Sequence, residues 1–182
     1  MTVATYKWTI DRYHQAVEAG VFEDVPVELL NGELIEMSPE GTPHAYYSDR
    51  SGKYLQRLLG DQADVREGHP ITLPNNSEPE PDLAIVQPLD AAYLEHHPYP
   101  ENIFWLIEYS NTSLDKDLKI KSKVYAEASI LEYWVINLRS RELIIFRDPV
   151  NGEYQSQVTL TSGMINPLSF PDVQIDVSRL IR

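Results

Sequence analysis

The feature that most constrains the fold is a nearly continuous apolar run at residues 102–110, NIFWLIEYS, which carries one carboxylate, Glu108. A strand that is apolar on both alternating faces must be covered on both sides, so this run predicts an inner strand of a layered sheet. A carboxylate inside such a strand is costly unless it is paired or binds a metal ion. Side chains alternate along a strand, so Glu108 and Ser110 are expected on the same face.

The remaining pattern surrounds this strand with helices and further strands. Asn31-Gly32 between two apolar-rich runs predicts a β-hairpin. Helices are expected at 9–20, 41–60 and 113–128, and strands at 82–87, 102–110, 131–138, 142–148 and 155–160. This order predicts an α/β (α+β) fold, with a mixed sheet flanked by helices. The length of 182 residues and the lack of a linker predict a single domain spanning 1–182.

Composition restricts the classes of function. The formal net charge of −13 is evidence against a general electrostatic binder of nucleic acid, because phosphate binding needs local Lys and Arg, but it does not exclude a nuclease. The absence of Cys excludes disulfides and thiolate zinc sites and fits a reducing cytosol. No apolar run approaches the roughly 18 residues of a membrane span. We therefore expect a cytoplasmic protein that is not embedded in a membrane.

Asp82 gives Glu108 a candidate partner. It stands at the entrance of the apolar run Leu83–Val86, directly after Pro81. Two carboxylates on neighbouring strands can converge on one hard cation, and Mg²⁺, or alternatively Mn²⁺, fits such a set of oxygen ligands. The alternative interpretation of Asp82 is a turn residue at a strand entry.

The helix at 113–128 offers a cation for the same site. Asp117, Lys121 and Tyr125 are spaced by four residues and share a face, so Lys121 can project toward the ends of the two strands. An ammonium group there can orient a water molecule and stabilise developing negative charge. The alternative for Lys121 is a solvated helix face. Asp117 either pairs with Lys121 or only favours the start of the helix.

These residues stand in segments that resemble a known family. Pro81-Asp82 followed by Glu-Tyr-Ser at 108–110 resembles the PD-(D/E)XK nuclease pattern. The ordered segments VELLNGELIEMSP, EPEPDLAIV, IEYSNTSLDKDLKIKSKVYAEA and LEYWVIN resemble the Uma family of putative restriction endonucleases, over roughly residues 8 to 180.

The resemblance implies a restriction-endonuclease-like core and Mg²⁺-dependent hydrolysis of phosphodiester bonds. Asp82 and Glu108 would be metal ligands, together with the backbone carbonyl of Tyr109. Ser110 occupies the position that is Lys in many nucleases, so the lysine would come from the following helix, as Lys121. Lys123 is the rival, and it would face elsewhere on a helix.

The resemblance also implies further positions. Glu33 in the hairpin matches an acidic position of the family and would be an additional ligand, with cross-strand pairing as the alternative.

For His44, capping or a surface position is the preferred interpretation. Where the family usually has AGVPEYW-like sequence, this chain has ASILEYW, so the Gly cap and the Pro are missing.

The resulting expectation is a metal-dependent endonuclease that acts on DNA, and homodimerisation would suit cuts in two strands. The alternative is a catalytically inactive binding or scaffold module that retains the nuclease fold. The acidic composition and Ser110 favour that alternative to some degree.

Overall fold

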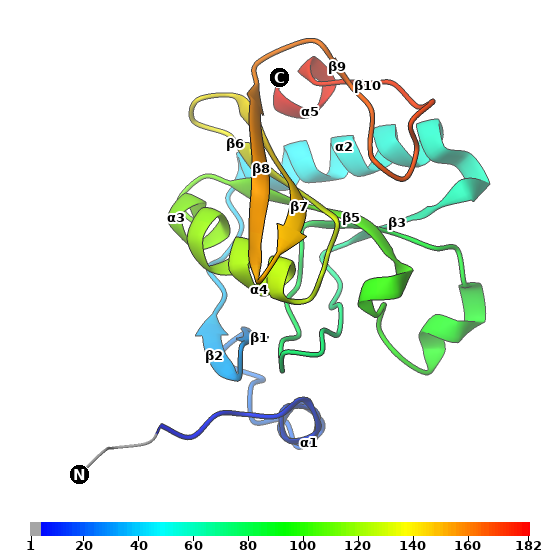
Figure 1. Ribbon diagram of the computed structural model, residues 1–182. Coiled ribbons are helices and arrows are strands. Elements are labelled where there is room, and N and C mark those ends of the chain that lie inside the picture. The colour runs from blue at the N-terminus through cyan, green and yellow to red at the C-terminus, as the bar shows by residue number, and fades with distance from the viewer. Residues whose placement is uncertain (1–4) are drawn as a thin grey trace.

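A computed structural model describes residues 5–182, and its centre is a six-stranded sheet (Figure 1). The strand order is β3-β4-β5-β6-β7-β8. The bounds are β3 Asp64–Glu67, β4 Leu83–Val86, β5 Ile103–Ser110, β6 Glu132–Asn137, β7 Glu142–Val150 and β8 Glu153–Leu160. Only the β5–β6 pair is parallel, and the other neighbours are antiparallel. The sheet is therefore mixed, which confirms the predicted fold class.

Helices cover both faces of this sheet, as the apolar run of β5 requires. Helix α2, Thr42–Leu59, and the short α5, Ser178–Ile181, pack on one face together with Trp105 and Ile107 of β5. The opposite face, which includes Leu106, is covered by the segment 114–127. That segment consists of α3 Leu114–Lys116, a π-helical turn Asp117–Lys121 and α4 Ser122–Glu127.

Short elements complete the chain. A small pair of strands, β9 Met164–Ile165 and β10 Ile175–Asp176, precedes α5. Single 3₁₀ turns occupy Gly60–Gln62, Asp90–Leu94 and Pro100–Asn102. In the part of the chain that the structure describes, no helix is both long and apolar enough to cross a bilayer.

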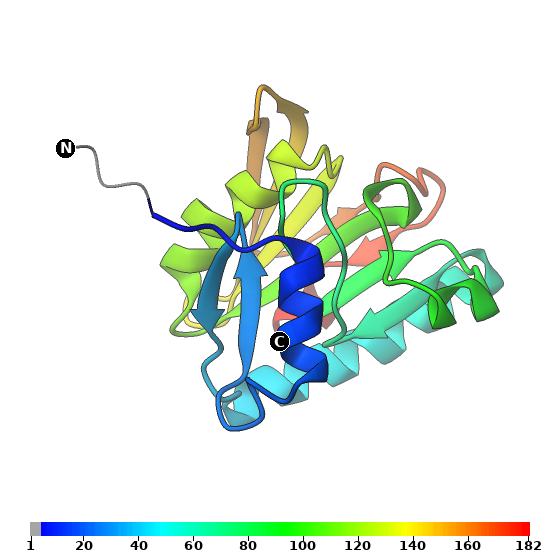
Figure 2. The same ribbon diagram turned by 90° about the horizontal axis from the view of Figure 1, so that it is seen from below.

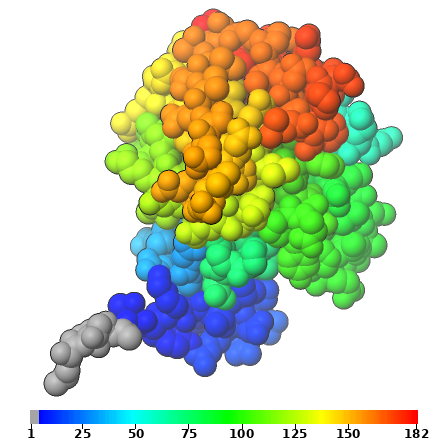
Figure 3. All heavy atoms as spheres, in the orientation of Figure 1, coloured from blue at the N-terminus to red at the C-terminus, as the bar shows by residue number. Residues whose placement is uncertain are grey.

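The N-terminal part forms a separate hairpin beside the sheet. Helix α1, Ile10–Glu18, is capped by Thr9 and leads to β1 Val27–Leu30 and β2 Glu33–Glu36 (Figure 2). Asn31 and Gly32 both have positive φ, at 48° and 75°, as a two-residue hairpin turn requires. In the space-filling view, these N-terminal residues gather at one end of the molecule (Figure 3).

The hairpin is joined to the body through the polar segment 75–81. The backbone of Leu29 exchanges hydrogen bonds with that of Glu78, and Gly32 N–H donates to the carbonyl of Asn76. Glu78 is buried and also contacts His14 of α1 at 2.8 Å. These contacts fix β1 against the body, and with it the acidic residue Glu28.

At the end of α4, in the ASILEYW segment, Ser129 occupies the capping position where the family usually has glycine. Ser129 has φ +61°, in the left-handed region where Gly is favoured. Its N–H donates to Ala126 and the N–H of Ile130 donates to Tyr125, which is the Schellman pattern of helix termination. The chain therefore keeps the cap geometry with a less suitable residue.

Ser129→Gly is expected to stabilise the protein by about 1 kcal/mol, because a non-glycine residue in the left-handed region costs roughly that amount. For a chain of this size the melting temperature should rise by about 2–4 °C. Thermal unfolding followed by circular dichroism measures the change. Ser129→Ala is the matched control, since it retains the Cβ atom. Equal stabilisation by both variants would contradict the backbone explanation.

Candidate active site

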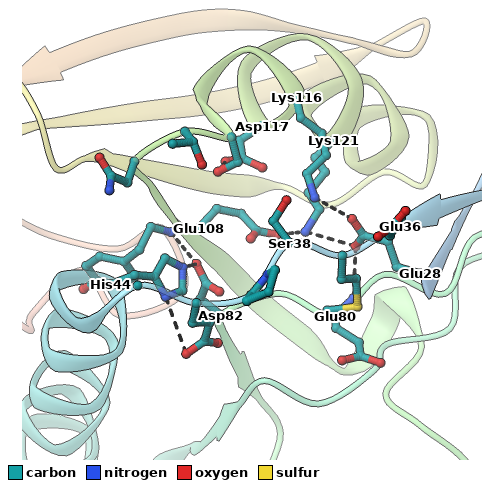
Figure 4. A pocket seen from close by; sticks show the side chains of 18 residues that line it. Glu28, Glu36, Ser38, His44, Glu80, Asp82, Glu108, Lys116, Asp117 and Lys121 are labelled. Atoms are coloured by element: carbon teal, nitrogen blue, oxygen red, sulfur yellow. Dashed lines mark hydrogen bonds and ion pairs between the residues drawn. The ribbon is translucent and has the colours of Figure 1, made fainter. Parts of the chain in front are cut away.

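A pocket of about 330 Å³ lies where the hairpin, the start of α2, the ends of β4 and β5 and the helical segment 114–121 meet (Figure 4). Its lining is rich in charged side chains. The acidic, lysine and histidine residues of the lining are Glu28, Glu36, Glu40, His44, Glu80, Asp82, Glu108, Lys116, Asp117 and Lys121. The three residues that sequence reasoning placed at the centre of the site, Asp82, Glu108 and Lys121, therefore line one pocket.

The register of the sheet brings Asp82 and Glu108 together. Strands β4 and β5 are antiparallel, with Leu83 opposite Ile107, so the residue before Leu83 lies beside the residue after Ile107. Asp82 Oδ2 accepts the backbone N–H of Tyr109, the residue that follows Glu108. Neighbouring strands thus supply the two carboxylates, as the sequence predicted.

Glu108 is buried and held by the helical segment. Its Oε1 accepts hydrogen bonds from Lys121 Nζ and from the hydroxyl of Tyr125, each at 2.8 Å. Lys121 is itself only 3 % exposed, so the solvated helix face that was the alternative for this residue does not describe its surroundings. The rival, Lys123, is exposed.

A second carboxylate also binds the ammonium group of Lys121. Glu28 of β1 is 1 % exposed, and its Oε2 lies 3.1 Å from Lys121 Nζ. The other oxygen of Glu28 accepts from Lys116 Nζ at 2.8 Å. Lys121 is therefore held between the carboxylates of Glu28 on β1 and Glu108 on β5. Lys116 lines the same pocket and is partly exposed.

Burial and charge shift the pKa values of this cluster in different directions. Burial raises the pKa of Glu108 above its ordinary value, against the opposing effect of Lys121. Burial alone would lower the pKa of Lys121, but Glu108 and Glu28 outweigh it, so the pKa is raised and the ammonium stays charged. For Glu28, Lys121 and Lys116 overcome the effect of burial and hold the pKa below its ordinary value.

Asp117 and Lys121 are the first and last residues of the π-helical turn. Asp117 Oδ2 accepts from the hydroxyls of Ser110 at 2.7 Å and Ser113 at 2.6 Å. Between residues 5 and 182 the recorded ion pairs of Lys121 are with Glu28 and Glu108, and none is with Asp117. Of the two roles considered for Asp117, direct pairing with Lys121 is not formed. Ser110 and Asp117 instead bond to each other beside the site.

Glu33 lies outside this arrangement. It is exposed and pairs with Lys7 Nζ at 2.6 Å, away from the pocket. The acidic hairpin residues that line the pocket are Glu28 of β1 and Glu36 at the end of β2, and Glu28 is the one that binds Lys121. Sequence reasoning missed Glu28, although it stands in the apolar run 27–30, which is the same signal that singled out Glu108.

The expectation for His44, capping or a surface position, was wrong, because its side chain is mostly buried and contacts Asp82. His44 lies in the first turn of α2, and its Nε2 is 2.9 Å from Asp82 Oδ2. Burial lowers the pKa of His44, but the hydrogen bond to Asp82 and the charge of that carboxylate outweigh burial, so the pKa is raised. The sequence carries no local signal for this contact, because it depends on how the start of α2 meets β4.

The comparisons with known proteins show the family and the fold. A family model described as Uma2, putative restriction endonuclease, matches residues 8–178. The chain belongs to the Uma2 family. The match includes every charged residue of the pocket, from the hairpin to the helical segment, and confirms the resemblance found in the sequence.

Solved structures support the fold of this Uma2 protein. A crystal structure of a putative nuclease of DUF820 from Anabaena variabilis has a TM-score of 0.70, with 12% sequence identity. The similarity covers 88% of this chain and 94% of that chain. At this identity, the likeness shows a common fold. A search of curated proteins gave no match.

Proposed function

We propose that this Uma2 protein is a Mg²⁺-dependent endonuclease that hydrolyses phosphodiester bonds in DNA. The observation that carries the proposal is the convergence of Asp82, Glu108 and Lys121 on one pocket, from two strands and a helix. Membership of a family of putative restriction endonucleases supports the same class of reaction.

The donor atoms fit a hard divalent cation. Among the residues that the structure describes, the hydrogen bonds of Asp82 fall on Oδ2 and those of Glu108 on Oε1. Each carboxylate therefore has an oxygen, Oδ1 or Oε2, that is not committed to the protein. An all-oxygen set with few protein ligands suits Mg²⁺, which retains several waters. The backbone carbonyl of Tyr109 is the further ligand we propose.

The charge of the pocket also favours a bound cation. Seven carboxylates and two lysines line it. A phosphodiester is an anion and would be repelled by this surplus of negative charge, unless a divalent ion compensates for it. When bound, such a cation polarises the phosphoryl group as a Lewis acid.

Lys121 would act on the reacting groups while the two carboxylates hold the cation. Its ammonium group donates hydrogen bonds and offsets the negative charge that develops as water attacks phosphorus. Glu28 is a positioning residue in this proposal. It keeps Lys121 charged and in place when Glu108 is engaged by the cation. Lys116, partly exposed at the same pocket, would contact a neighbouring phosphate.

Incubation of purified protein with supercoiled plasmid tests this function. We expect nicked or linear products with Mg²⁺ or Mn²⁺, and none with a chelator, because the acidic pocket needs a cation to accept phosphate. Asp82→Asn should abolish the products. Single-stranded DNA and RNA are parallel substrates, and preferential cleavage of RNA would contradict the DNA assignment. Linear products formed without a nicked intermediate would support paired cuts by a homodimer.

If no cleavage is seen, calorimetry with Mg²⁺ distinguishes a protein that binds the metal ion from one that does not. Metal binding without cleavage of any substrate would contradict endonuclease activity on general DNA. Absence of both metal binding and cleavage would favour the non-catalytic scaffold that retains the nuclease fold.

A further inference from the structure

Positive charge is concentrated in two segments of this acidic chain. Residues 42–59, which form α2, and residues 178–182, which contain α5, together carry five Lys or Arg side chains and a single Asp. The whole chain has a formal net charge of −13, so its other segments hold a large excess of carboxylates. We call the five basic side chains the α2–α5 surface. They are Arg50, Lys53, Arg57, Arg179 and Arg182.

Contacts between the two helices bring these side chains together. The guanidinium group of Arg179 lies 5.2 Å from the centre of the Tyr54 ring, which belongs to α2. The Tyr54 hydroxyl accepts a hydrogen bond from the backbone N–H of Asp176, just before α5. Arg50 donates a hydrogen bond to the main-chain oxygen of Arg182. Figure 1 shows α5 alongside α2, at the end of the molecule opposite α1. The basic residues of both helices therefore share one surface.

The arginines of this surface are open to an outside partner. Four of the five basic side chains are exposed, and Arg50 is half-buried. Arg50, Lys53 and Arg57 are spaced by three and four residues, so they lie on one face of α2. Among residues 5–182, the ion pair recorded for the surface joins Lys53 to Asp49, at an exposed position. No side-chain carboxylate in that part of the chain is recorded in an ion pair with the four arginines, so their charge is left for a partner.

Helix α2 connects this surface with the proposed active site. Its first turn supplies His44 to the pocket. With a rise of about 1.5 Å per residue, Arg50 and Arg57 lie about 9 Å and about 20 Å further along the helix axis. Both distances are shorter than one turn of duplex DNA, about 34 Å. A strand with one phosphate in the pocket can therefore present neighbouring phosphates to these guanidinium groups, which bind phosphate oxygens through paired hydrogen bonds.

We propose that the α2–α5 surface binds the phosphate backbone of DNA beside the cleaved bond, without reading the base sequence. Affinity for a phosphate backbone comes from neutralisation by Lys and Arg, which the acidic pocket supplies only in part. Contacts to phosphate position a duplex but carry no sequence information. The choice of DNA as the partner rests on the proposed function, whereas the separation of charge along the chain does not.

Fluorescence anisotropy of a labelled duplex oligonucleotide tests this surface, with a chelator present to prevent cleavage. Arg57→Gln and Arg179→Gln should each raise Kd by about three- to tenfold on two duplexes of unrelated sequence, and each should lower the slope of log K against log salt by about 1. Arg57→Lys keeps the charge, so it should keep the slope and guards against misfolding. Arg12→Gln is the matched control and should bind as wild type. Arg12 is an exposed arginine 5.2 Å from the Tyr6 ring, beside α1.

The outcomes separate this surface from the proposed reaction. If the wild type does not bind DNA at low salt, or if the arginine variants keep its Kd and slope, the surface is overturned and plasmid cleavage still decides the nuclease function. Weaker binding by the variants of a protein that cleaves no nucleic acid would support the surface and count against that function. A loss of binding on one duplex alone would contradict backbone recognition. Sedimentation velocity covers the remaining partner: loss of a dimer in the variants, with unchanged DNA binding, would assign the surface to contact between copies and overturn the proposal.

Discussion

Glu108→Gln is expected to lower cleavage of plasmid DNA by about 10³-fold, because a bound cation contributes several kcal/mol to phosphoryl chemistry and each ~1.4 kcal/mol is a factor of ten. The amide removes the negative charge that the cation needs. Its oxygen can still accept from Lys121 and Tyr125, which bind the carboxylate in the structure at 2.8 Å. Folding stability should therefore change by no more than about 1 kcal/mol, because Lys121 keeps Glu28 as a charged partner at 3.1 Å and both hydrogen bonds to residue 108 are retained.

Single-turnover cleavage at saturating Mg²⁺ measures the first effect, and urea unfolding with a chelator measures the second. Glu153→Gln is the control, because Glu153 is an exposed carboxylate on β8, outside the pocket. Cleavage that persists in Glu108→Gln would rule out the proposed role of this residue. A large loss of stability in the same variant would instead assign Glu108 to the fold.

Lys121→Met should destabilise the metal-free protein by about 3–5 kcal/mol, the usual cost of breaking a buried ion pair from one side. Lys121 lies 2.8 Å from Glu108 and 3.1 Å from Glu28, and both carboxylates are buried. Removing the ammonium leaves Glu108 without a cationic partner and Glu28 with Lys116 alone. Cleavage should also be lost, because the variant has no cation at this place to offset developing charge.

A double-mutant cycle with Glu108→Gln identifies the cause of the instability. Lys121→Met combined with Glu108→Gln should be more stable than Lys121→Met alone, because the uncompensated carboxylate is gone; coupling between contacting residues is typically about 0.5–3 kcal/mol. Mg²⁺ should raise the melting temperature of Lys121→Met, since an ion that binds only the folded state stabilises it. Lys123→Met, at an exposed position two residues away, is the control. Additive effects in the cycle would show that Lys121 and Glu108 are not energetically linked.

The structure assigns several of the acidic residues near the site to contacts other than those expected from the sequence. The hairpin residue that binds Lys121 is Glu28 of β1, whereas Glu33 of β2, the hairpin residue expected at the site, pairs with Lys7. Asp117 is bound by the hydroxyls of Ser110 and Ser113, and the serine at position 110 therefore belongs to a hydrogen-bonded pair beside the site. Sequence reasoning named Ser110 and Asp117 but not their hydrogen bond, and it missed Glu28 altogether.

The sequence by itself determined the mixed α/β architecture, because an apolar strand with two hydrophobic faces needs cover on both sides. It also made Asp82, Glu108 and Lys121 candidates, since a carboxylate at the edge of or inside an apolar strand needs a partner and Lys121 shares a helix face with Asp117 and Tyr125. The resemblance to the Uma family then favoured the site over the alternatives that this pattern left open for Asp82 and Lys121. The signals within the pattern are local, and they follow from periodicity and the cost of burying charge. Only the tertiary structure decided the contributions of Glu28 and His44. Their roles depend on how a hairpin and a helix start, far apart along the chain, dock against the ends of β4 and β5, and no local pattern encodes that docking.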